Sequence, residues 1–176
     1  MNYKILVLLS FFFFNPFCLD GISQKRQKNG LKIGNQAPNF ELPMIDQTLL
    51  SLESLRGNIV FVDFWASWCR GCRNKKGTIS VYNKFKDRKF KNANGFTILS
   101  VSFDVNKEAW INAISNDGLI WPYHVCDFKS FSSPVFKLYK LGGIPRNWLI
   151  DANGIIIARD IGYSELNEQL IRQSKD

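Results

Sequence analysis

One stretch decides the fold of this chain: Val62-Asp63-Phe64-Trp65-Ala66-Ser67-Trp68-Cys69-Arg70-Gly71-Cys72. It contains the end of an apolar run over residues 59–65, which predicts a strand buried on both faces. A helix-compatible segment follows the two cysteines to about residue 89. Such a junction is expected to hold both thiols at the N-terminus of a helix, where the helix dipole favours a thiolate. The Cys-x-x-Cys spacing also lets the sulfurs close a disulfide, so the stretch predicts a reversible dithiol/disulfide switch.

Three other uses of Cys69 and Cys72 compete with redox exchange. In a zinc site, His124 and Cys126 would complete a Cys₃His set, but this second pair lacks the usual Cys-x-x-Cys spacing. A structural disulfide would not require a strand-to-helix junction flanked by two tryptophans. A peroxidatic cysteine would want an upstream proline and threonine, which residues 64–68 do not provide. We therefore predict redox exchange through a Cys69–Cys72 disulfide, with no metal and no other cofactor.

The two cysteines have different expected roles. Cys69 comes first and should lie nearer the loop surface, so we expect its thiolate to attack a partner disulfide. Cys72 should lie one turn into the helix, more covered, and should resolve the mixed disulfide. Arg70 places a cation beside the pair and should favour the thiolate and the reduced form.

Asp63 is the one charged residue in the apolar strand. A carboxylate at such a position is costly to desolvate unless it has a partner or a function. It could be a base that accepts the proton of the second cysteine during exchange. It could equally be a residue near the strand end that pairs with a basic neighbour. The spacing of the residues alone does not separate the two interpretations.

The N-terminal residues predict export. Residues 1–23 have the pattern of a secretory signal: Lys4 is followed by an apolar run over residues 5–14, and small residues lie near residue 23. As a retained anchor the run is short of the roughly 20 residues that a membrane span needs. Lipidation of Cys18 would want small residues just before it. Residues 24–32 predict a flexible tether, and residues 33–176 one domain in a periplasmic or otherwise exported protein, where disulfides are available as substrates.

The remaining sequence predicts the order β, β, α, β, α, β, α, β, β, α. The strands are expected near residues 40–42, 59–65, 96–102, 121–126, 146–150 and 155–160. A βαβ alternation that ends in an antiparallel hairpin gives an α/β fold with a mixed central sheet and helices on both faces. The formal net charge of +8 fits solvated basic faces, or steering toward acidic partners or a membrane surface. No nucleic-acid-binding motif accompanies it.

Ile144-Pro145 interrupts the path into an apolar strand. This is typical of a cis-proline turn, although an ordinary loop proline would look the same. Beside the thiols, such a turn would offer the backbone of Ile144 to an extended substrate. Together with Trp68, which precedes Cys69, Ile144 and Pro145 are the predicted substrate-binding residues. His124 and Cys126 are better explained as buried strand residues.

The motifs together resemble a known family. Residues 63–72, Ile144-Pro145 and the later Trp148-Leu149-Ile150-Asp151-x-x-Gly154 are similar to the thioredoxin superfamily. The entry Ala37-Pro38-x-Phe40 and a helix expected over residues 106–118 resemble, more closely, the TlpA/ResA-like thiol–disulfide oxidoreductases. The resemblance covers roughly residues 33–171. It implies a thioredoxin-like fold, Cys69 as nucleophile, Cys72 as resolving thiol, Pro145 in cis and Asp63 as the base.

The resemblance also implies partners: exported protein disulfides and thiols, and a membrane electron donor. We expect a monomer. Two departures concern redox tuning. Lys75 and Gly77 stand where the family often has a glutamate and a proline, and Arg70-Gly71 is not the common Gly-Pro pair. Lys75 should favour a thiolate if it points toward the site, so Arg70 and Lys75 are the predicted tuning residues. The alternative function is a non-catalytic dithiol module that binds a metal or holds a structural disulfide.

Overall fold

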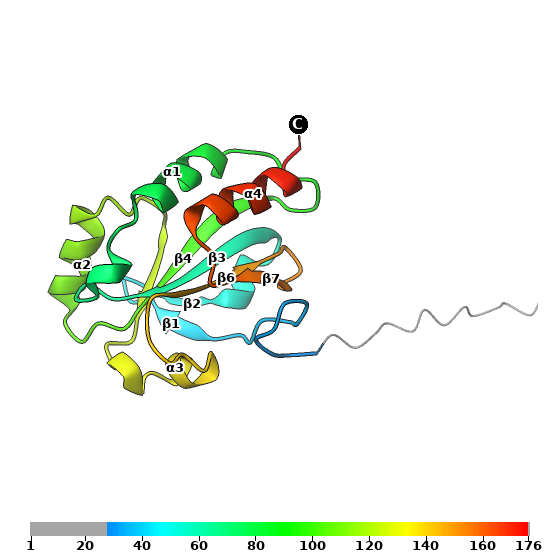
Figure 1. Ribbon diagram of the computed structural model, residues 1–176. Helices are drawn as coiled ribbons and strands as arrows, with labels where there is room; N and C mark the ends of the chain where they lie inside the picture. The colour runs from blue at the N-terminus through cyan, green and yellow to red at the C-terminus, as the bar shows by residue number, and fades with distance from the viewer. Residues whose placement is uncertain (1–27, 176) are drawn as a thin grey trace, which may run out of the picture.

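A five-stranded mixed sheet forms the centre of the molecule (Figure 1). The computed structural model describes residues 28–175. The strands lie in the order β5-β4-β3-β6-β7. Their bounds are β3 Asn58–Trp65, β4 Gly95–Ser102, β5 Tyr123–Cys126, β6 Arg146–Ile150 and β7 Ile156–Arg159. The pairs β3–β4 and β4–β5 are parallel, whereas β6 is antiparallel to both β3 and β7. The predicted α/β fold with a mixed sheet is therefore confirmed.

Helices cover both faces of this sheet. Their bounds are α1 Lys76–Phe85, α2 Lys107–Asn116, α3 Pro134–Leu138 and α4 Tyr163–Gln173. Buried residues of α1, α2 and α4 share one core cluster with the sheet, and those of α3 belong to the cluster on the opposite face. A small antiparallel pair, β1 Glu41–Pro43 and β2 Leu49–Ser51, contributes to the α3 side.

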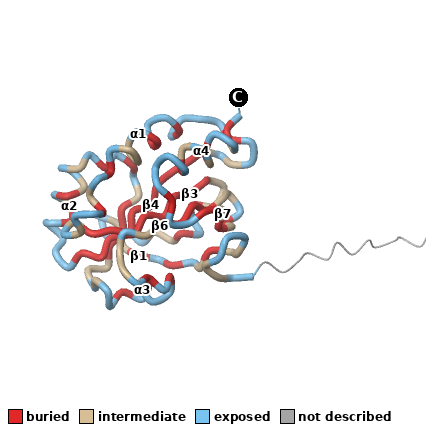
Figure 2. Tube along the Cα trace, in the orientation of Figure 1, coloured by how far each residue is buried: buried red, intermediate tan, exposed pale blue. Residues whose placement is uncertain are grey.

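The central strand β3 explains the unbroken apolar run. Successive side chains of a strand point to opposite faces. Phe61 and Trp65 accordingly pack in the cluster with α1 and α4, while Val62 and Phe64 pack in the cluster with α3. Figure 2 shows the central strands as the buried centre of the molecule. A strand covered on both faces needs apolar residues, which leaves Asp63 as the exception within residues 59–65.

Local capping contacts fix the starts of several helices. Ser51 caps the 3₁₀ helix η1, Leu52–Leu55, by accepting a hydrogen bond from the N–H of Glu53. Asn106 caps α2 by accepting one from Ala109. Pro134 occupies the first turn of α3.

Three segments differ from the prediction. The strand β2 was not expected. The helix expected directly after Cys69 is instead a 3₁₀ turn η2, Arg70–Cys72, then a break, then α1. Residues 28–32, expected to belong to a flexible tether, are bound to the domain, because Gly30 donates to the carbonyl of Gln36 and Trp148 donates to that of Leu31. The predicted signal and the first part of the tether lie outside the described residues. None of the helices within residues 28–175 is long and apolar enough to cross a membrane.

Candidate active site

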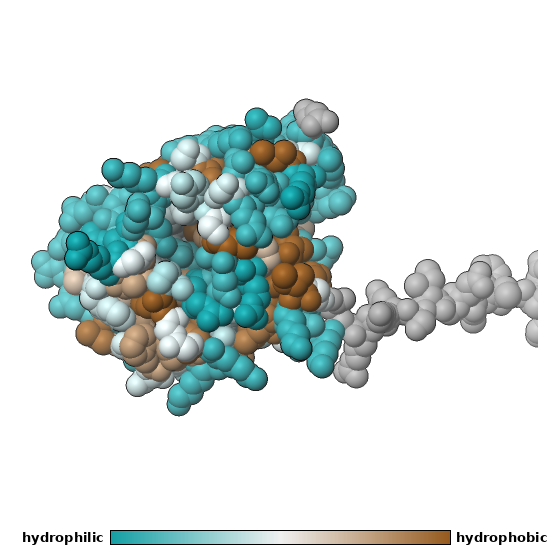
Figure 3. Space-filling view, viewed as in Figure 1, coloured by the Kyte–Doolittle hydropathy of each residue, from teal (hydrophilic) through white to brown (hydrophobic). Residues whose placement is uncertain are grey.

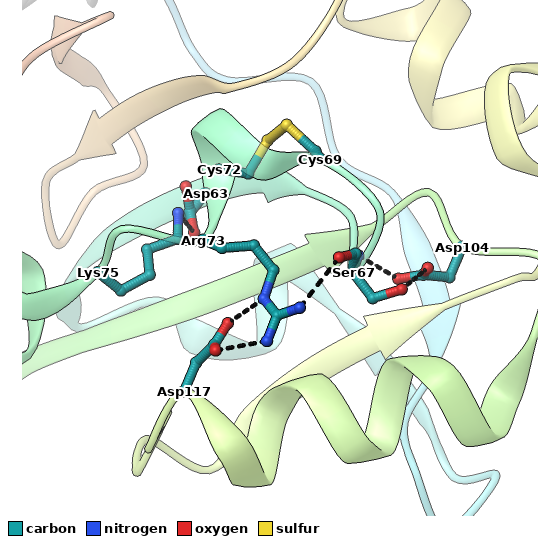
Figure 4. A network of polar contacts seen from close by, with 8 residues as sticks. All are labelled: Asp63, Ser67, Cys69, Cys72, Arg73, Lys75, Asp104 and Asp117. Atoms are coloured by element: carbon teal, nitrogen blue, oxygen red, sulfur yellow. Dashed lines mark hydrogen bonds and ion pairs between the residues drawn. A yellow bond between two sulfur atoms is a disulfide. The ribbon is translucent and has the colours of Figure 1, made fainter.

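The two cysteines lie on the loop and 3₁₀ turn that follow β3 (Figure 4). Cys69 and Cys72 are joined by a disulfide. Cys69 is half-buried, whereas Cys72 is only 2% exposed and packs in the core cluster with α1. The pair is therefore asymmetric, with the first sulfur closer to the surface and the second covered by the domain.

A buried carboxylate holds the loop that precedes Cys69. Ser67 donates to Asp104 with both its backbone N–H, at 2.9 Å, and its hydroxyl, at 2.5 Å. Asp104 is 1% exposed and also accepts from the Ser102 hydroxyl at 2.6 Å. Because Ser102 ends β4 and Ser67 follows β3, the contact ties the redox loop to the ends of two adjacent parallel strands.

An ion pair holds the turn after the cysteines. The Arg73 guanidinium donates to both carboxylate oxygens of Asp117, at 2.5 and 2.6 Å, and to the carbonyl of Ser67 at 3.3 Å (Figure 4). Asp117 is the C-cap residue that directly follows α2. Arg73 thus links the redox loop to α2, and the bidentate geometry fixes its orientation.

The second ion pair lies inside the domain. Lys75 Nζ is 2.6 Å from Asp63 Oδ2, and the two side chains are only 8% and 4% exposed. In Figure 4 the pair is drawn on the Cys72 side of the disulfide. The ammonium group of Lys75 therefore pairs with the Asp63 carboxylate. The tuning role predicted for Lys75 depended on its pointing toward the thiols, and the structure pairs it with Asp63 instead. Lys75 is thus the basic neighbour that one interpretation of Asp63 required.

The break between η2 and α1 falls at the residues that form these two ion pairs. Residues 73–75 lie between η2 and α1, with Arg73 directed toward Asp117 and Lys75 toward Asp63. The α-helix consequently begins at Lys76, after both cysteines. The prediction that both thiols lie at an α-helix N-terminus is wrong, and the dipole of α1 acts on them from a greater distance.

The loop before β6 faces the first cysteine. The Ile144–Pro145 peptide bond is cis, as expected. The carbonyl oxygen of Ile144 lies 4.0 Å from Cys69 Sγ, a contact rather than a hydrogen bond, because a disulfide sulfur carries no hydrogen. Among the described residues, neither the N–H nor the C=O of Ile144 has a hydrogen-bonded backbone partner. Trp68 is 52% exposed and packs edge-to-face on Phe131, so an apolar surface lies beside the disulfide.

The other candidate residues lie in different surroundings. Arg70 is exposed, and within residues 28–175 it forms no ion pair. His124 is buried against Trp121 and its Nε2 lies 2.9 Å from the Trp121 carbonyl oxygen. Burial lowers the pKa of His124 and raises the pKa of Cys126 to about 11. The described part of the chain contains no group of three or more His, Cys, Asp or Glu side chains placed to hold a metal ion.

Sequence reasoning missed the residues that position the redox loop: Ser67, Arg73, Asp104 and Asp117. One signal could have found Asp104. It lies two residues after a buried strand, as the redox loop lies after another, and the carboxyl ends of adjacent parallel strands meet at one edge of a sheet. Arg73 and Asp117 are 44 positions apart and carry no comparable pattern.

A mixed sheet with helices on both faces, a Cys-x-x-Cys disulfide after its central strand and a cis-proline facing that disulfide define a thioredoxin-like thiol–disulfide oxidoreductase. The chain belongs to the AhpC/TSA family, whose model matches residues 33–159. It is a TlpA/ResA-like member of the thioredoxin superfamily.

Individual relatives agree with this assignment. The chain is 28% identical over 144 residues to the thiol-disulfide oxidoreductase ResA of Bacillus anthracis, covering 81% of this chain and 77% of the relative. A solved thiol-disulfide oxidoreductase from Bacteroides fragilis is 35% identical, with a TM-score of 0.68 over 78% of this chain and 98% of the other. The thioredoxin domain of an oxidoreductase from Bacteroides vulgatus is 32% identical, with a TM-score of 0.70 over 81% and 98%.

Proposed function

We propose that this thiol–disulfide oxidoreductase is exported and exchanges disulfides with other proteins, using Cys69 as the nucleophile and Cys72 as the resolving thiol. The observation that carries the assignment of roles is the asymmetry of the pair. Cys69 is half-buried beside the exposed Trp68, while Cys72 is 2% exposed. A disulfide that belongs to a folded partner protein can approach Cys69 Sγ but not the covered Cys72 Sγ.

The exchange proceeds in two steps. In the reduced enzyme, the Cys69 thiolate attacks one sulfur of the partner disulfide. The partner S–S bond breaks, a mixed disulfide forms, and the other partner sulfur leaves as a thiolate. Cys72 then loses its proton and attacks Cys69 Sγ, which closes the Cys69–Cys72 disulfide and releases the second partner thiol. Two electrons pass to the partner. Asp63 is the proposed acceptor of the Cys72 proton.

The proposed docking surface is the loop before β6 with its apolar neighbours. The unpartnered N–H and C=O of Ile144 would pair with an extended partner segment, in the manner of strand addition. Ile144 is half-buried beside Cys69 and is followed by the exposed Pro145. Trp68 with Phe131 offers aromatic contact area. The disulfide is the only cofactor that the proposal needs.

Export rests on the sequence pattern of residues 1–23. In an oxidising compartment the enzyme would need a donor to reduce its disulfide again, and a membrane protein is the proposed donor. The chain is proposed to act as a monomer.

The roles of the cysteines are tested with single substitutions in the reduced full-length chain. Cys72→Ser is expected to accumulate a mixed disulfide with a model protein substrate, visible as a dithiothreitol-sensitive adduct by mass spectrometry. Cys69→Ser is expected to form no adduct and to lose reductase activity. Full turnover by Cys72→Ser, or an adduct at Cys72 in wild type, would show that the assigned order of attack is wrong.

A further inference from the structure

A groove lies beside the proposed docking loop, on the α3 side of the sheet. It has a volume of about 510 Å³, within the range of ligand-binding sites. Its walls come from the N-terminal segment, the end of α3, and strands β6 and β7. The lining residues are Lys28, Asn29, Gly30, Leu31, Lys32, Asn35, Pro38, Leu138, Tyr139, Lys140, Arg146, Trp148 and Arg159.

The charges of this groove all have one sign. Five of its lining residues are basic and none is acidic. Arg146 and Arg159 share Asp160, at 2.5 and 3.3 Å, whereas no described carboxylate pairs with Lys28, Lys32 or Lys140. In Figure 3, hydrophilic and hydrophobic residues lie side by side on the face between α4 and α3, as Figure 1 places these helices. Unpaired cations around a concave surface attract an anionic ligand.

The floor of the groove is apolar and fixed. Trp148 is buried there, its indole N–H donates to the Leu31 carbonyl, and the Arg146 guanidinium lies 5.6 Å from the ring centre. The N-terminal wall is held by the hydrogen bonds between Lys28, Gly30 and Gln36. An apolar floor under a cationic rim suits a polypeptide, which can place acidic side chains on the rim and its main chain and apolar side chains on the floor.

The groove continues directly from the redox site. Arg146, on its rim, follows Pro145, and Ile144 contacts Cys69. An extended chain advances about 3.3 Å per residue. A segment paired with Ile144 would therefore enter the groove within a few residues of the cysteine that reacts with Cys69.

We infer that this groove binds an acidic segment of the substrate polypeptide, within a few residues of the reacting disulfide. The inference rests on the proposed function and adds a substrate class to it: protein disulfides flanked by aspartate or glutamate. The residues that precede Lys28 in this chain are unsuited to the groove, because Lys25 and Arg26 carry the same charge as its rim.

The test compares disulfide-bonded peptides that differ only in carrying three Asp, three Ser or three Lys residues on each side of one cysteine. The measured quantity is the second-order rate constant for their reduction by the prereduced full-length chain. The wild type is expected to reduce the acidic peptide about ten times faster than the basic one at low salt, and the ratio should fall toward one at high salt.

The decisive variant is Lys28→Gln/Lys32→Gln/Lys140→Gln, in which none of the replaced side chains has a described contact. Its matched control is Lys86→Gln/Lys89→Gln/Lys175→Gln, which changes the net charge by the same amount. These lysines lie around the end of α1 and the bridge between Phe90 and Ser174. The groove variant is expected to reduce all three peptides at similar rates. The control variant is expected to keep the wild-type preference for the acidic peptide.

If the wild type reduces the serine peptide at a normal rate but shows no preference between the acidic and basic peptides, the groove assignment is overturned and the proposed function stays intact. Equal loss of preference in both variants would assign the effect to overall charge and also overturn it. Failure to reduce any peptide would overturn the proposed function and the groove assignment together. A further outcome is that the wild type shows no peptide preference but binds vesicles of anionic lipid, and that only the groove variant loses this binding. The groove would then be a membrane contact and the inference would be overturned.

Discussion

Removing the ammonium group of Lys75 is expected to destabilise the fold more than any surface substitution. Lys75 and Asp63 form a 2.6 Å ion pair whose side chains are 8% and 4% exposed. At an effective dielectric constant of about 20, two unit charges at this distance attract with roughly 6 kcal/mol. The desolvation of two ions, several kcal/mol each, offsets most of that gain. The intact pair therefore contributes little net stability, but either charge alone is costly.

Lys75→Met retains the length and apolar character of the side-chain stem and leaves the Asp63 carboxylate buried without a partner. Such a truncation costs about 3–5 kcal/mol. The free energy of unfolding of oxidised protein, measured by urea denaturation, should fall by this amount. The double variant Asp63→Asn/Lys75→Met should lose clearly less than the sum of the two single variants, with a coupling energy of at least about 2 kcal/mol.

The control is Lys86→Met, at the exposed end of α1, which should change stability by no more than about 0.5 kcal/mol. A loss below about 1 kcal/mol for Lys75→Met, or additive single effects in the double variant, would refute the reasoning. Either result would mean that water screens the pair and that its burial is not the dominant factor.

Two further predictions concern other parts of the domain. Gly77→Ala should destabilise the chain by about 1–2 kcal/mol in thermal unfolding, because the added Cβ would collide with the ring of Tyr163 on α4. In a Tyr163→Ser background the same change should instead stabilise α1 by up to about 1 kcal/mol, the helix propensity of alanine over glycine. Burial lowers the pKa of His124, so the unfolded chain binds its proton more readily and stability falls as the pH drops below about 6.5. His124→Gln should lose less stability than wild type between pH 7.5 and 5.5 in urea titrations, and parallel pH profiles would contradict this.

Much of the fold could be predicted because its signals are local. The apolar run of β3, the Asn106 cap of α2 and the proline that starts α3 each act through neighbours in the sequence. The break before α1 could not be predicted in this way. It accompanies two ion pairs, Arg73 with Asp117 and Lys75 with Asp63, whose partners come from distant elements. Helical propensity over residues 73–75 is outweighed by tertiary contacts.

The same division applies to the site. The cysteines and Pro145 are marked by motifs, and the structure places them together. The hydrogen bonds between Ser67 and Asp104 were missed because a serine and an aspartate near strand ends are common. Only the order of the strands shows that β3 and β4 are neighbours and that these two residues meet. Lys75 was recognised as unusual, but its direction depends on how the chain leaves η2, which no spacing rule determines.

The ion pair also changes what a proton-accepting role for Asp63 requires. Protonation of Asp63 alone would leave Lys75 as a buried cation without a partner, which is costly. If the proton comes from Cys72, however, a thiolate forms as the carboxylate is neutralised, so one anion near Lys75 replaces another. Pairing and proton acceptance are then compatible, and Lys75 would assist the resolving step by keeping the charge balanced. On this hypothesis Asp63→Asn and Lys75→Met both slow the release of partner from a mixed disulfide at neutral pH. An unchanged rate in Lys75→Met, with a slowed one in Asp63→Asn, would leave Lys75 as a structural partner only.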